Sequence, residues 1–171
     1  MTSTGAFRPL PIKMQGRSLG CPWGGYGALR LAFKYPDRFG AVAALSAGLF
    51  HPDGISWEHG PGGRRWESRD KWYARSFAAP FSLAAYNEAS PFAYLPSLQD
   101  SASAPDILLI AGDDDEMGAY DGTVEMFLEL RRIGLKPELR IGNGGHNHRF
   151  WRSMLKETFS FLDQALRPPA L

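Results

Sequence analysis

Two short polar stretches in the second half of the 171-residue chain carry the residue types that acid–base chemistry needs. The first, GDDDE at residues 112–116, follows an apolar run, and the second, GNGGHNHRFW, presents His146 after a glycine turn. An imidazole can take and return a proton near neutral pH, and a carboxylate on one ring nitrogen leaves the other nitrogen free to accept. His146 paired with one aspartate is therefore a candidate general base. The glycines and the acidic loop disfavour the alternative, a surface-loop histidine without function.

The neighbouring polar residues are open to other interpretations. A solvated acidic loop accounts for the presence of at least two of Asp113, Asp114 and Asp115. We expect one of the three to be functional. A calcium loop is disfavoured because its alternating oxygen ligands are absent. His148 could form an H-x-H metal pair with His146, but no third ligand is evident, so we interpret it as a surface or supporting residue. We expect neither a metal nor a cofactor.

A third feature is the turn at Gly24 and Gly25, which opens a helical pattern directly after Pro22. Hydrolases with a nucleophile on a sharp strand-to-helix turn place the nucleophile, the acid and the histidine in this order along the chain. The order matches here, although proline stands where the nucleophile would be.

The elements that would position these features alternate between helix and strand. GAVAALSAG and DILLIAG are apolar runs typical of strands buried on both faces of a parallel sheet. This order predicts an α/β fold, a mostly parallel sheet flanked by helices, with its site at the carboxyl ends of the strands. We expect helices at 26–35, 123–133 and 149–166, strands at 40–48, 106–112 and 136–142, and an insert at about 51–98. The buried helix faces are expected to hold Leu29, Ala32 and Phe33, then Val124, Phe127 and Leu128, then Phe150, Met154, Phe161 and Leu162.

The composition of the chain disfavours some classes of binding partner. With 19 basic and 18 acidic residues and no run of like charge, a nucleic-acid partner is not expected. A single cysteine, Cys21, excludes an internal disulfide. No apolar run approaches the roughly 20 residues that span a bilayer, so no membrane partner is expected. As written the chain is expected to be soluble and cytoplasmic, although a signal peptide could precede it, and the oligomeric state stays open.

Together, GGYGALRLAFKYPDRFGAVAALSAGL, YNEASPFAYLPSL, PDILLIAGDDDE and GGHNHRFW resemble a known family. It is the family of α/β-hydrolase esterases that includes esterase D, feruloyl esterases and the antigen 85 mycolyltransferases. The resemblance covers residues 24 to about 166 and the C-terminal half of the family's domain. It implies hydrolysis of a small-molecule carboxylic ester without a cofactor, and it implies that the first strands and an oxyanion-hole donor precede this chain.

The family's motifs can be carried over residue by residue. The family's G-T-E-D pattern aligns with residues 112–115 and makes Asp115 the acid. Its G-G-H-D-W pattern makes His146 the base, with Asn147 and His148 in place of the usual aspartate and tryptophan. The serine of G-x-S-M-G-G-Y-G-A-L falls on Pro22.

Two nearby residues could replace the missing serine. Cys21 is one position early, and on a strand that offset turns its side chain to the opposite face. Ser18 lies in a literal G-x-S-x-G, GRSLG, but no clear strand precedes it and four extra residues would separate it from the family helix. Neither is expected to act.

The genetic code offers another explanation. When KMQGRSLGCPW is back-translated and read two bases later, its codons permit Asp-Ala-Arg-Ala-Ile-Ala-Gly-Leu-Ser-Met directly before Gly24. The serine then spans the codons of Cys21 and Pro22. We therefore expect residues 1–23 to be an irregular, out-of-frame segment and residues 24–171 to be the C-terminal part of a truncated hydrolase domain. Such a chain would be an inactive relative of serine esterases.

Two alternatives stay open. One is a non-catalytic binding protein on a hydrolase scaffold, and the other is an acyltransferase of the antigen 85 type. The aspartate at position 115 favours the hydrolases, because that transferase group uses glutamate. Trp57, Trp66, Trp72 and Tyr73 in the insert are candidates for the substrate pocket, with ordinary packing as the alternative.

Overall fold

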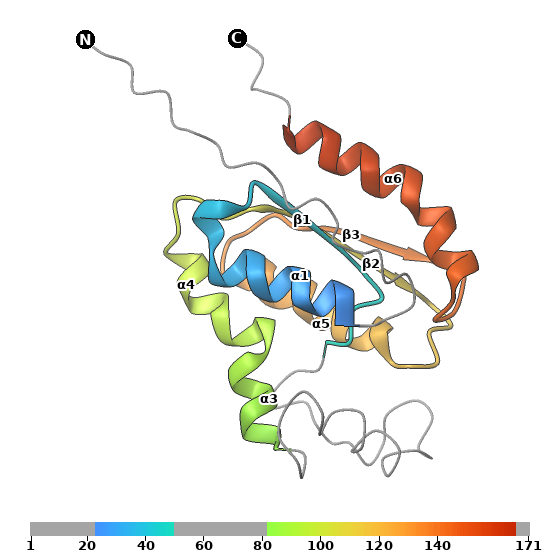
Figure 1. Cartoon of the computed structure of the whole chain (residues 1–171), viewed down its shortest axis with the longest axis horizontal. Coiled ribbons are helices and arrows are strands. Elements are labelled where there is room, and N and C mark those ends of the chain that lie inside the picture. Colours follow the sequence, from blue (N-terminus) through green and yellow to red (C-terminus); the bar gives the residue numbers. More distant parts are fainter. Residues whose placement is uncertain (1–22, 50–81, 167–171) are drawn as a thin grey trace.

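The computed structural model describes residues 23–49 and 82–166 (Figure 1). Residues 1–22 of the expected irregular segment 1–23 and the four aromatic pocket candidates of the insert lie outside these residues, whereas Trp23 is the first residue of a helix. Along the chain the elements are α1 (Trp23–Lys34), the 3-10 helix η1 (Pro36–Arg38), β1 (Ala41–Leu45), α3 (Leu83–Ala89), the 3-10 helix η2 (Pro91–Tyr94), α4 (Leu95–Gln99), β2 (Asp106–Gly112), α5 (Ala119–Arg132), β3 (Glu138–Gly142) and α6 (His148–Leu166).

The three described strands form one parallel sheet in the order β1-β2-β3. Val42 of β1 lies opposite Ile107 of β2, and Leu109 of β2 lies opposite Leu139 of β3. All three strands run the same way, so their carboxyl ends meet at one edge of the sheet. The expected α/β fold with a parallel sheet is confirmed, and the loops after β2 and β3 are brought side by side.

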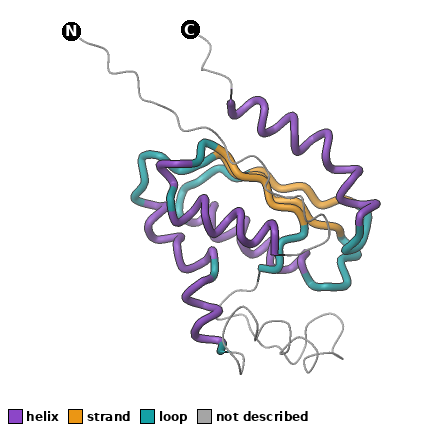
Figure 2. The backbone as a smooth tube through the Cα atoms, viewed as in Figure 1, coloured by secondary structure: helices purple, strands orange, loops and turns teal. Residues whose placement is uncertain are grey.

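Helices cover both faces of the sheet, as Figures 1 and 2 show. Alternate residues of the strands point to opposite faces. Val42 and Leu109 belong to a core with α1 and α5, whereas Ala43 and Leu108 belong to a core with α6. Burial on both faces explains why the sequence of β1 and β2 is continuously apolar.

The buried faces of the helices match the sequence pattern in α1 and differ in α5. Leu29 and Phe33 of α1 are fully buried, as expected. In α5 the expectation is wrong for Leu128, which is 54% exposed, whereas Phe127 packs against the core beside the fully buried Met126 and Leu130. The helix begins at Ala119, before the expected Thr123, and turns its small residues toward the rest of the fold.

The described end of the expected insert, residues 82–98, folds into α3, η2 and α4. Ser82 caps α3 by accepting the backbone N–H of Ala85. Tyr86 and Leu98 are fully buried in the core on the α1 side of the sheet. This part of the insert therefore belongs to the packed body of the domain.

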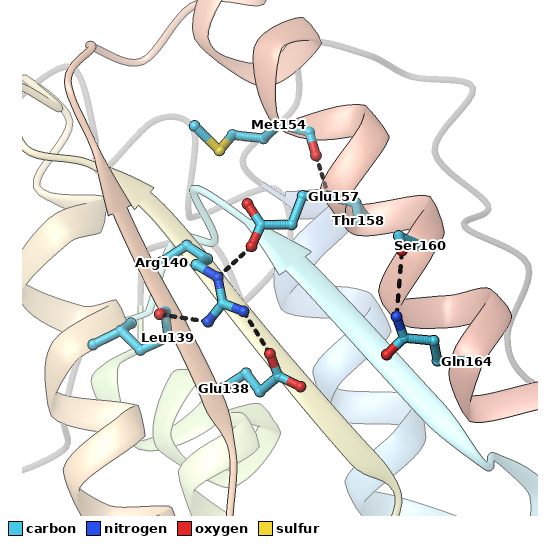
Figure 3. Close-up of polar contacts among 8 residues, drawn as sticks. All are labelled: Glu138, Leu139, Arg140, Met154, Glu157, Thr158, Ser160 and Gln164. Atoms are coloured by element: carbon cyan, nitrogen blue, oxygen red, sulfur yellow. Dashed lines mark hydrogen bonds and ion pairs between the residues drawn. The ribbon is translucent and has the colours of Figure 1, made fainter.

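Arg140 links the edge strand β3 to α6 (Figure 3). Its guanidinium donates to the carboxylate of Glu157 on α6, and also to that of Glu138 at 2.6 Å. The hydrogen bond to Glu157 and the two negative charges raise the pKa of Arg140. Because these side chains are well exposed to solvent, the ion pairs orient the strand and contribute little to stability.

Gly122 of α5 packs tightly against the backbone of Leu49 and provides a test of the packing. A Cβ at this position of α5 would lie 1.8 Å from the backbone oxygen of Leu49. We expect Gly122→Ala to lower the free energy of unfolding in urea by about 1–3 kcal/mol, because the helix must move away. Gly27→Ala in α1 is the matched control, since its Cβ would meet nothing within 4 Å and alanine favours a helix by about 0.5–1 kcal/mol. Equal stability of the two variants would refute this packing.

Candidate active site

Asp115 lies in the loop that follows β2, at the carboxyl edge of the sheet. Its side chain has 0% exposure, although it carries a carboxylate. One oxygen accepts the backbone N–H of Met117 at 3.0 Å, and both oxygens lie within hydrogen-bond reach of the His146 ring. A buried carboxylate needs such partners, since an unpaired charge in the interior is costly.

His146 lies in the loop that follows β3, and its ring faces Asp115. The Nδ1 atom is 2.9 Å from Oδ2 and 3.1 Å from Oδ1 of Asp115. An ionised carboxylate only accepts, so Nδ1 carries the proton and Nε2 keeps its lone pair. The side chain is 8% exposed, and its buried Nε2 has no hydrogen-bond partner in the structure as described. The geometry leaves Nε2 as a free proton acceptor.

Backbone and carboxylate contacts hold the two loops together. The N–H of Asp113 donates to Gly142 O, and the Asp113 carboxylate accepts the N–H of Gly144, both at 3.0 Å. Glu116 accepts the N–H of His146 itself, also at 3.0 Å. Asp113 and Glu116 are therefore structural parts of the loop pair, whereas the side chain of Asp114 is exposed.

Gly112 is the residue that allows the loops to come this close. A Cβ at Gly112 would lie 2.0 Å from the backbone oxygen of Gly144, which no side chain could accommodate without a shift of backbone. The close approach of the two loops therefore explains why glycine precedes the aspartates of the acid loop.

The first turn of α1 reaches the same edge of the sheet. A Cβ at Gly25 would lie 2.9 Å from the Cβ of Ala47, two residues after the end of β1. A helix N-terminus presents free N–H groups and a partial positive charge, both of which favour a developing oxyanion. Ser18, Cys21 and Pro22, the sequence candidates around the nucleophile position, lie outside the described residues.

The environment of Asp115 lowers its pKa below the ordinary value of 3.8. Burial alone would raise it, but the hydrogen bond and charge of His146 and the bonds from Met117 and Ser46 outweigh burial. A carboxyl whose pKa is lower in the folded state stabilises the fold above its unfolded pKa. That contribution is lost as the pH falls through the folded pKa.

A pH series tests this linkage. We expect the free energy of unfolding of the unchanged protein to fall more steeply than that of Asp115→Asn as the pH falls below about 5. Asparagine cannot ionise, so the variant lacks the stabilisation by an ionised carboxylate at every pH. Parallel pH curves for the two proteins would contradict the assigned environment of Asp115.

Three residues of the site were missed by reasoning from the sequence: Ser46, Glu116 and Trp151. Trp151 lies on α6, with its ring 5.1 Å from that of His146 and edge-on to it. Its indole N–H donates to Ser46 at 3.1 Å. The position of Ser46 at the end of a buried strand was an available signal, because such ends line the site edge.

His148 is the first residue of α6, and its ring lies edge-on to that of Trp151, with the centroids 5.1 Å apart. Within residues 23–49 and 82–166, no group of three or more His, Cys, Asp or Glu side chains is arranged to hold a metal ion. No helix in these ranges is both long and apolar enough to cross a membrane.

A parallel sheet covered by helices on both faces, with a buried Asp–His pair in the loops at its carboxyl edge, is the architecture of the α/β-hydrolase class. Residues 9–162 match the model of the esterase family described as "Putative esterase", and the chain belongs to this family. The match begins before Gly24, the first residue of the sequence resemblance, and includes both Ser18 and Pro22.

Individual relatives agree with this assignment. The chain is 26% identical over 159 residues to an acetyl esterase of Caldicellulosiruptor saccharolyticus, with 91% of this chain and 58% of the relative covered. Its fold resembles a ferulic acid esterase, with a TM-score of 0.58, 22% identity, and 84% of this chain and 48% of that chain covered. It also resembles the fluorophosphonate-binding serine hydrolase F of Staphylococcus aureus, with a TM-score of 0.60, 20% identity, and coverage of 81% and 50%. The chain thus spans about half the length of these relatives.

Proposed function

We propose that Asp115 and His146 are the acid and the general base of a carboxylic-ester hydrolase, and that Pro22 occupies its nucleophile position. The observation that carries this proposal is the orientation of His146, whose Nδ1 lies 2.9 Å from the Asp115 carboxylate while its buried Nε2 has no described partner. Proline has no nucleophilic atom, so the chain as written has no serine-dependent turnover.

With a serine present, the reaction is that of a serine esterase. As the serine oxygen bonds to the acyl carbon, His146 Nε2 takes its proton, and Asp115 stabilises the imidazolium. His146 then gives the proton to the leaving alcohol oxygen as the ester C–O bond breaks. Water, deprotonated by the same nitrogen, hydrolyses the acyl-enzyme and regenerates the serine.

The missing serine is explained by a shift of reading frame near Gly24. The helix after the elbow is present as α1, and the bases that encode Cys21 and Pro22 permit a serine in the shifted frame. We define the frame-repaired protein as the product in which Asp-Ala-Arg-Ala-Ile-Ala-Gly-Leu-Ser-Met directly precedes Gly24, with the upstream sequence read in that frame. The nucleotide sequence must spell such an elbow, preceded by a long open frame, for this explanation to hold.

The substrate class is a carboxylic ester with a small-molecule alcohol. The relative named as an acetyl esterase supports a short acyl group, so p-nitrophenyl acetate is the probe of choice. The experiment compares release of p-nitrophenolate by the frame-repaired protein and by the chain as written. Saturable turnover by the repaired protein alone supports the proposal, and its absence there refutes it.

The two other functions considered from the sequence predict different results. A binding protein on this scaffold requires Pro22 to be encoded in frame and shows no turnover after repair. An acyltransferase transfers the acetyl group to an added alcohol faster than to water. The aspartate in the acid position supports hydrolysis over transfer.

A further inference from the structure

Ser46 has a backbone conformation that sets it apart from the other described residues. It follows β1 and is fully buried, and among the described non-glycine residues it alone has a positive φ, 44°. Its N–H still pairs with Ile110 O of β2 at 2.8 Å, so the sheet contact continues to this residue. A side-chain-bearing residue keeps this strained conformation only where its surroundings fix it, often at a functional site.

The side chain of Ser46 connects α6 to the acid of the site. Its Oγ accepts the indole N–H of Trp151 at 3.1 Å, and Ser46 is also among the groups that lower the pKa of Asp115. Since an ionised carboxylate only accepts, the effect of Ser46 on Asp115 comes from its hydroxyl proton. Ser46 therefore accepts from Trp151 and favours the ionised form of Asp115.

The ring of Trp151 contacts His146 directly. Its indole N–H donates to Ser46, which is one of the groups that lower the pKa of Asp115. Its ring lies edge-on to that of His146, with centroids 5.1 Å apart and planes at 88°. Trp151 is 8% exposed, so its indole N–H would be buried without a partner if Ser46 lacked the hydroxyl. Packing alone requires an aromatic ring here, whereas the hydrogen bond requires an indole and a hydroxyl.

We propose that Ser46 and Trp151 are positioning residues, which orient the carboxylate of Asp115 and the ring of His146 toward each other. This inference rests on the proposed function, in which that pair performs acid–base catalysis. It assigns a role to the strain at Ser46, because the residue holds the indole of Trp151 while its backbone is in the left-handed conformation.

The titration of Asp115 provides a readout that needs no nucleophile. Ser46 is among the partners that lower the pKa of Asp115, so losing its hydroxyl must raise that pKa. The other titratable or charged groups on the two site loops and the adjoining end of α6 are kept in the experiment: Asp113, Asp114, Glu116, His146, His148, Arg149 and Arg152.

The experiment follows the carboxyl carbon of Asp115 by NMR in the complete 171-residue chain labelled with 13C-aspartate. Ser46→Gly is the central variant, since glycine adopts a φ of 44° without strain and lacks the hydroxyl. Trp151→Phe keeps a ring and removes the N–H. Ser90→Ala is the control, because Ser90 is also fully buried but its hydroxyl accepts from Phe92 in η2.

We expect the titration midpoint of Asp115 to move to higher pH in Ser46→Gly, to move less in Trp151→Phe, and to stay in place in Ser90→Ala. The indole acts through the hydroxyl, so adding Trp151→Phe to Ser46→Gly should cause no further change. An unmoved midpoint in either single variant would overturn the proposal, and so would full additivity in the double variant. Should Ser46→Gly fail to fold, Trp151→Phe alone decides.

The outcome separates this inference from the proposed function. Shifted midpoints together with an inactive frame-repaired protein would refute the esterase and leave the orienting contacts intact. An active repaired protein with unmoved midpoints would refute the positioning role alone.

Discussion

Asp115→Asn is expected to lower kcat of the frame-repaired protein for p-nitrophenyl acetate by about 10⁴-fold, with little change in KM. Asparagine has the shape of aspartate, but its neutral amide holds the imidazole in the wrong tautomer and cannot stabilise the imidazolium. The 2.9 Å contact between Asp115 and Nδ1 of His146 is what the substitution disturbs. The change acts on the transition state, so kcat carries the effect.

Asp114→Asn is the matched control for this prediction. It makes the same chemical change one residue earlier in the same loop, where the side chain is exposed. We expect its kcat to stay within about twofold of the parent, as is usual for a surface substitution. Equal losses in the two variants would show that general charge, rather than the contact with His146, determines the rate.

The second large effect concerns the nucleophile. The chain as written is expected to hydrolyse p-nitrophenyl acetate about 10⁶-fold more slowly per molecule than the frame-repaired protein, as when a catalytic serine is removed. Any remaining hydrolysis should be unaffected by Ser18→Ala or Cys21→Ala. Initial rates of p-nitrophenolate release at saturating substrate measure the difference.

Replacing the restored serine by alanine in the repaired protein is the control for this comparison. It should reduce turnover to the level of the chain as written. The family match includes the GRSLG stretch, so Ser18→Ala is the decisive variant in the unrepaired chain. If that substitution abolished a saturable activity, Ser18 would be the nucleophile and the proposal for Pro22 would be wrong.

The sequence predicted β1 and β2 well because these two strands are buried on both faces. β2 was expected at residues 106–112 and has these bounds, and the apolar run of β1 was equally clear. The contact between Asp115 and His146 was expected as well, since each follows a strand of one parallel sheet. Their catalytic role stays a proposal.

The buried face of α5 could not be found from apolar spacing. Gly122 lies so close to Leu49 that the first turns of the helix face inward with small residues, while Met126 and Leu130 are buried further along and Leu128 is left on the surface. Close approach between backbones depends on the partner element, which a helical pattern does not contain.

The contacts around Asp115 also could not be predicted from local sequence patterns. Ser46 and Trp151 are 105 residues apart, and neither belongs to a motif that indicates a shared hydrogen bond. The strained φ of Ser46 is equally hidden, because serine has no preference for that conformation.

Covalent labelling with a fluorophosphonate tests whether His146 activates the restored serine, because an activated serine displaces fluoride and forms a stable phosphonate ester. The measurement is the site and extent of labelling, by mass spectrometry, in the chain as written, the frame-repaired protein and its His146→Ala variant. We expect one adduct, on the restored serine of the repaired protein, and no adduct in the chain as written or in the His146→Ala variant. An adduct in the chain as written, or labelling of the repaired protein that does not depend on His146, would contradict it.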